Sequence, residues 1–85
     1  MNKQLEGIFK ENSTFVISGF DSALMGYATV QGEVTAVYSR EDFIDLLRAL
    51  RGCTYPEALI EFQDKFASTD VGPGTPIFLT RIKEI

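Results

Sequence analysis

Histidine is absent from this sequence, and Cys53 is its only cysteine. A lone cysteine cannot form an intramolecular disulfide, and without imidazoles the usual His/Cys ligand set of a zinc site cannot be assembled in one chain. Acid–base catalysis by histidine is excluded as well. We therefore expect no metal, no cofactor and no enzymatic activity.

Long apolar runs and clusters of basic residues are missing too. The opening residues MNKQLEGIFKEN lack the apolar core of a signal peptide, and no segment approaches the ~18 consecutive apolar residues of a membrane span. Eight basic and twelve acidic residues give a formal charge of -4 without a basic patch for nucleic acid. The sequence predicts a cytoplasmic protein with no nucleic-acid or membrane partner, and its mild acidity would suit a basic protein partner.

What remains is a globular composition. The 85 residues are 45% hydrophobic and 12% aromatic, which favours one folded domain over a disordered chain. A chain this short builds one core between a sheet and a layer of helices, and it has little left to enclose a deep cavity. Any ligand site is expected at the surface or between chains.

The two ends of the chain predict a helix and two strands. Residues Lys3–Lys10 carry apolar side chains on one side and predict a short helix, which Gly7 weakens. β-branched and aromatic residues predict a strand over Thr14–Ser18. A closing strand is predicted over Pro76–Ile82, where a proline at the first position is compatible with a strand.

The middle of the chain predicts a β-hairpin. Its strands are Ala23–Val30 and Glu33–Tyr38, and Gln31-Gly32 is the connecting turn. A helix over Ser22–Gln31 is the competing interpretation. The residues that disfavour this helix are Gly26, Tyr27, Thr29 and Val30.

The strongest helix signal follows the hairpin. Ser39 and Asp42 form a capping box that opens a helix over Arg40–Arg51, and Gly52 is placed to end it. The spacing predicts one buried face with Ile44 at its edge. That face consists of Phe43, Leu46, Leu47 and Leu50.

A second capping box, Thr54 with Glu57, opens another helix with Pro56 in its first turn. Its predicted buried face consists of Tyr55, Leu59, Phe62 and Phe66. The sequence thus predicts an α+β domain. A small antiparallel or mixed sheet of about four strands carries two consecutive amphipathic helices on one face, with a short helix before it.

One candidate binding site is the acidic side of the second helix. Glu57, Glu61 and Asp64 lie close together there, and Ile60 lies beside them as a rim residue of the core or an exposed contact. The stripe could dock a basic partner. The favoured interpretation is a solvated helix face on which Glu61 and Lys65 form a weak pair.

A second candidate is the segment STDVGPGTP, Ser68–Pro76, which we call the Gly-Pro loop. Its glycines could present N–H groups to a phosphate, but Pro73 and Pro76 each remove a donor. We favour a rigid connector that aims the last strand and could also serve as a recognition loop. Its candidate contact residues are Asp70, Gly72, Gly74 and Thr75.

Strand aromatics give a further expectation. Tyr27, Tyr38 and Phe78 are predicted on the sheet. Should one sheet face be left uncovered by helices, these side chains would favour a homodimer or another protein interface.

Four stretches, FDSALMGY, AVYSREDFIDLL, TYPEALIEF and VGPGTPIFL, occur in an order that resembles a recurrent type of small protein of tailed bacteriophages and prophages. The resemblance covers about Phe20 to Leu79. Met25 and Ser39 depart from its pattern, in which Ile and Asp are usual, and so does the end of the second helix, Phe62–Phe66. The resemblance implies a phage origin and the cytoplasm of a host cell, and it transfers no catalytic residue.

These observations together favour a non-enzymatic accessory protein that binds a host or phage protein. One alternative is a nucleotide-binding protein or sponge, in which Thr75, N–H groups near Gly74 and Arg81 meet a phosphate at an oligomer interface. Another is a minor structural or assembly component of the virion.

Overall fold

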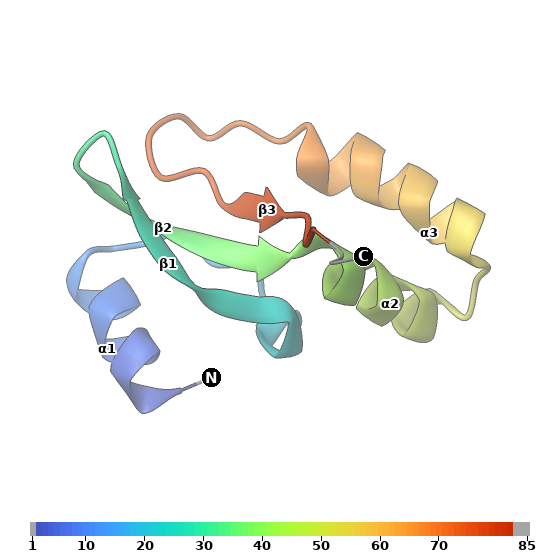
Figure 1. Cartoon of the computed structure of the whole chain (residues 1–85), viewed down its shortest axis with the longest axis horizontal. Helices are drawn as coiled ribbons and strands as arrows, with labels where there is room; N and C mark the ends of the chain where they lie inside the picture. Colours follow the sequence, from blue (N-terminus) through green and yellow to red (C-terminus); the bar gives the residue numbers. More distant parts are fainter. Residues whose placement is uncertain (1, 83–85) are drawn as a thin grey trace.

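The computed structural model describes residues 2–82, and its sheet is built on the predicted hairpin (Figure 1). β1 (Leu24–Val30) and β2 (Glu33–Ser39) are antiparallel, and Gln31 and Gly32 join them with φ angles of 52° and 81°. Two successive positive φ angles are typical of the type I′ turn, whose twist matches that of the strands. The hairpin is confirmed over the competing helix, and a 3₁₀ turn, η1 (Asp21–Ala23), precedes it.

The third strand, β3 (Ile77–Leu79), lies beside β2 and parallel to it, so the strand order is β1-β2-β3 in a mixed sheet. The parallel direction follows from the connection, because the chain leaves the end of β2 through two helices and then returns. The predicted closing strand over Pro76–Ile82 is therefore present, but only three of its residues pair.

The predicted strand over Thr14–Ser18 is wrong. Within the described chain this segment joins no sheet, and the Ile17 N–H donates instead to the Tyr38 hydroxyl at 2.8 Å. Phe15 and Val16 are exposed. Their side chains favour an extended backbone, but a strand also needs a neighbour with unpaired backbone groups. The sheet accordingly has three strands in residues 2–82, and the expectation of about four is wrong.

The short N-terminal helix is confirmed as α1 (Lys3–Glu11). Asn2 caps it, because its side-chain oxygen accepts from the Gln4 N–H at 2.7 Å. Phe9 is buried, and this contact with the core anchors the helix in spite of Gly7.

α2 (Arg40–Arg51) has the predicted bounds. Ser39 Oγ accepts from the Asp42 N–H at 3.3 Å, and Gly52 ends the helix in the left-handed conformation with φ 63°. Leu50 was predicted in the core but is 60% exposed, because α2 runs away from the sheet and its last turn lies beyond the core (Figure 1). The fully buried residues of α2 are Phe43, Ile44 and Leu47.

α3 (Tyr55–Glu61) begins at the predicted capping box, in which Thr54 and Glu57 each accept from the other's backbone N–H. It continues into η2 (Phe62–Ala67), whose turns are π-helical. Tyr55 was predicted to be buried but is 43% exposed, since the start of α3 lies far from the sheet (Figure 1). The buried and half-buried apolar residues of this stretch are Ala58, Leu59, Phe62 and Phe66.

The core is centred on the ring of Phe43. Phe20, which precedes η1, stacks on it with a centroid distance of 3.9 Å and an angle of 10° between planes. Edge-to-face contacts at 4.9 to 5.8 Å complete the cluster. The residues that make these edge contacts are Tyr38, Phe62, Phe66 and Phe78. Rings from β2, β3 and η2 therefore meet on one side chain of α2.

The two helices α2 and α3 lie side by side at the end of the sheet where β2 and β3 finish (Figure 1). Phe43 of α2 packs against Tyr38 of β2, and Phe62 at the start of η2 packs against Phe78 of β3. Contact between the helices and the sheet is thus concentrated at this end.

We expect Phe43→Ala to lower the free energy of unfolding by about 3–5 kcal/mol, since it empties the centre of a close-packed cluster. Urea denaturation followed by circular dichroism measures the change. Leu50→Ala is the matched control on the same helix, and we expect it to change the free energy by no more than about 0.5 kcal/mol. Similar losses in the two variants would contradict this description of the core.

Candidate functional site

The Gly-Pro loop connects η2 to β3 and is braced by its own side chains. Asp70 Oδ1 accepts from the Gly72 N–H at 2.8 Å. Thr75 Oγ1 accepts from the Val71 N–H at 3.0 Å and donates to the Gly72 carbonyl at 2.6 Å. Gly72 and Gly74 have φ angles of 84° and 91°, which residues with a Cβ rarely adopt. These features agree with a rigid connector.

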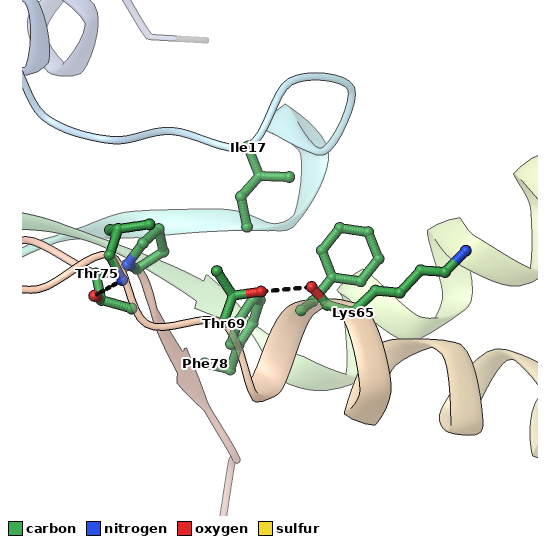
Figure 2. Close-up of a pocket in the computed structure, with 8 residues that line it drawn as sticks. Ile17, Lys65, Thr69, Thr75 and Phe78 are labelled. Atoms are coloured by element: carbon green, nitrogen blue, oxygen red, sulfur yellow. Dashed lines mark hydrogen bonds between the residues drawn. The ribbon is translucent and has the colours of Figure 1, made fainter.

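One side of the loop borders an apolar pocket of about 230 Å³, which we call the loop pocket (Figure 2). Four separate parts of the chain form it: the segment before η1, the end of η2, the loop and β3. The lining residues are Ile17, Lys65, Phe66, Thr69, Val71, Thr75, Pro76 and Phe78.

Ile17 is held over the pocket by the hydroxyl of Tyr38, which accepts its backbone N–H. Burial raises the pKa of the Tyr38 phenol, so this group remains a neutral hydroxyl at physiological pH. The segment that failed to form a strand thus becomes one wall of the loop pocket.

The two threonine hydroxyls of the loop pocket are already engaged. Thr69 Oγ1 donates to the Lys65 carbonyl at 2.6 Å, and the Thr75 hydroxyl is bonded within the loop. Figure 2 shows the Lys65 ammonium directed away from Ile17 and Phe78, so the side chain contributes mainly its carbon stem. The pocket therefore presents mainly apolar surface.

The other side of the loop borders a more open depression of about 390 Å³. It contains all four loop residues that the sequence suggested as contacts, together with the hairpin turn. Its lining residues are Val30, Gln31, Thr35, Asp70, Gly72, Pro73, Gly74, Thr75 and Ile77.

This open depression has the wrong chemistry for a phosphate. The Gly72 N–H already donates to Asp70, and the Thr75 N–H donates to the Gly72 carbonyl at 3.2 Å. The Asp70 carboxylate would also repel an anion. Arg81, the other residue of the phosphate hypothesis, already pairs with Asp42 at 3.7 Å.

The acidic side of α3 is used largely to hold the helices. The Glu57 carboxylate accepts from the Thr54 N–H at 3.1 Å and its hydroxyl at 2.8 Å, which lowers the pKa of Glu57. The Glu61 carboxylate binds the Arg51 guanidinium of α2, with its closest contact at 2.9 Å. That hydrogen bond lowers the pKa of Glu61 and raises the pKa of Arg51.

Asp64 of the predicted acidic stripe and Ile60 beside it remain directed to solvent. Ile60 is 59% exposed and Asp64 is exposed, whereas the side chain of Glu61 is only 19% exposed because of its pairing with Arg51. Ile60 is therefore an exposed residue and no rim residue of the core. An apolar side chain at this position is a second contact point to test.

Residues 2–82 contain no group of His, Cys, Asp and Glu that could hold a metal ion. In the same range, no helix is both long and apolar enough to cross a membrane. Comparison of the chain with protein-family models, with curated proteins and with solved structures found no match. The resemblance to phage proteins therefore stays a prediction.

Sequence reasoning found Thr75 but missed the rest of the loop pocket. Phe66 and Phe78 were assigned to the core and the sheet, and Ile17 to a strand. The available signal was the apolar character of these residues, which does not reveal that one side of each is left open to solvent.

We expect the Arg51–Glu61 pair to make stability depend on pH. The folded pKa of Glu61 is lowered, so its contribution is present above the unfolded pKa of about 4.3 and is lost as the pH falls through the folded pKa. The difference in free energy of unfolding between the wild type and Glu61→Gln should therefore shrink between pH 7 and pH 3. Urea titrations at both pH values measure it, and a constant difference would contradict the role of the pair.

Proposed function

We propose that this chain is a non-enzymatic protein-binding protein whose partner inserts an apolar side chain into the loop pocket. In the setting that the resemblance implies, it would be a phage-encoded accessory protein that acts on a host or phage protein in the cytoplasm of the host.

The observation that carries this proposal is the combination of size and polarity in the loop pocket. Its volume of about 230 Å³ is below the ~300–1,000 Å³ of typical small-molecule sites, and it suits a single large side chain. Thr69 and Thr75 bond within the chain, so the pocket offers little to a polar ligand. An aliphatic or aromatic residue on a partner protein would displace water there without leaving a polar group unpaired.

The position of the pocket also supports a protein partner. Val71 is 46% exposed and stands on the braced Gly-Pro loop, next to a pocket wall made by Ile17. A loop held in one conformation loses little entropy when a partner binds, which favours recognition on its surface.

The same chemistry predicts that nucleotides do not bind. A ligand at 100 times its dissociation constant would stabilise the fold by about 2.7 kcal/mol. We expect no shift of the thermal midpoint with ATP, GTP or their monophosphates at millimolar concentration. A saturable shift that disappears in Thr75→Val would instead favour the nucleotide alternative.

Two matched variants test the loop pocket against the acidic helix face. Peptides are first selected from a random displayed library on the wild-type chain, and their affinities are measured by fluorescence anisotropy. Val71→Asp places a charge at the pocket and should weaken binding roughly tenfold to a hundredfold, the worth of one buried apolar side chain. Ile60→Asp makes the same change on α3 and should leave binding unchanged.

Both side chains are about half exposed, so both variants are expected to fold, which circular dichroism verifies. Loss of binding in Ile60→Asp alone would move the site to the helix face. Equal binding by both variants, or no enrichment of peptides with an apolar anchor, would overturn the proposal.

A further inference from the structure

A second surface lies at the opposite edge of the sheet, along β1. The strand order pairs β1 on one side only within the described residues, and its sequence LMGYATV has no charged residue and no proline. Proteins usually protect an open edge strand with charged residues or proline, or cover it with a helix or loop. Here Met25 and Tyr27 are 43% and 47% exposed, and Thr29 is exposed as well.

The register of the hairpin shows which backbone groups face outward. The turn has two residues, so Val30 and Glu33 exchange hydrogen bonds, and the bonded pairs alternate along the strand. Ala28 and Gly26 therefore direct their N–H and C=O groups toward β2. The backbone groups of Tyr27 and Thr29 point away from the sheet.

A β-bulge limits the length of this edge. The register shifts between Leu24 and Gly26, which leaves Met25 as the extra residue. The regular part of the open edge is thus short, from Gly26 to Val30, and its midpoint is Ala28.

We propose that two copies of this chain pair through their β1 edges, antiparallel and related by a two-fold axis at Ala28. Tyr27 then lies opposite Thr29 of the second copy, and each exchanges both backbone hydrogen bonds with the other. The two small Ala28 side chains face one another at the axis. Tyr27 and Thr29 form an aromatic–β-branched cross-strand pair, which occurs twice by symmetry.

Charge selects the β1 edge as the place where two copies can meet. The chain carries a formal charge of -4, so two copies repel wherever their acidic surfaces meet. Along β1 they meet at a neutral seam. Glu33 lies on β2, two strand spacings or roughly 10 Å from the second β1, which is about one Debye length at physiological salt.

The contact area sets the strength that we expect. Stable interfaces use about 20–30 residues on each side, whereas this seam uses only the short segment from Gly26 to Val30. The dimer should therefore be weak and depend on concentration. It also leaves the loop pocket free, because that pocket lies next to β3 at the other edge of the sheet.

Sedimentation equilibrium from micromolar to millimolar concentration tests the proposal. The wild type should rise from 9.5 kDa toward twice that mass. Thr29→Lys adds the missing edge charge and should weaken association at least tenfold. Thr29→Val keeps the seam neutral and should still associate, and circular dichroism should show that both variants fold.

Amide hydrogen exchange locates the contact in the wild type. The Tyr27 and Thr29 amides should exchange more slowly at high concentration than at low concentration, since they become bonded only in the dimer. A wild type that stays monomeric at millimolar concentration would overturn the proposal. Association of Thr29→Lys equal to that of the wild type would do so too, because the interface would then lie elsewhere.

Discussion

The packing of aromatic rings around Phe43 is the interaction on which the rest of the structure depends. β3 has three residues and could not hold the closing segment by hydrogen bonds alone. The ring of Phe78 fixes it, because it packs against Phe43 at 5.0 Å and against Phe62 at 4.8 Å. This cluster therefore decides where the end of η2 and the start of β3 lie, and so how far the Gly-Pro loop must reach between them.

The candidate binding surfaces follow from that arrangement. The loop pocket forms where Phe66, Phe78 and Ile17 cover the core incompletely, and the braced loop keeps it open. β1 and β3 are the outer strands (Figure 1). The loop pocket is lined by Phe78 of β3, so it and the open β1 edge lie on opposite sides of β2. In a dimer joined through β1, the two loop pockets would lie on the outer sides, away from the dimer contact. Such a dimer would bind a repetitive or dimeric partner more tightly than a single copy does.

Several polar side chains of this protein support its architecture. Ser39, Thr54 and Glu57 cap helices, Arg51 and Glu61 join α2 to α3, and Asp70 and Thr75 brace the loop. The loop pocket presents mainly apolar surface, which is the reason to propose a protein partner.

The sequence by itself determined the elements whose signals are local. The ends of α2, the capping box of α3, the helix α1 and the turn of the hairpin were all predicted, because each depends on residues within about four positions of one another. Of the candidate site, the four loop residues were found for the same reason, since glycines and prolines mark a loop directly.

Only the tertiary structure decided which faces are buried and which segments meet. Helical periodicity placed Leu50 and Tyr55 in the core, but both lie where α2 and α3 extend past the sheet, and Ala58 is buried instead. Thr14–Ser18 has the composition of a strand but no partner with unpaired backbone groups. The loop pocket is lined by both Ile17 and Phe78, which lie far apart in the sequence. Burial and strand pairing depend on residues distant in sequence, which a local pattern does not specify.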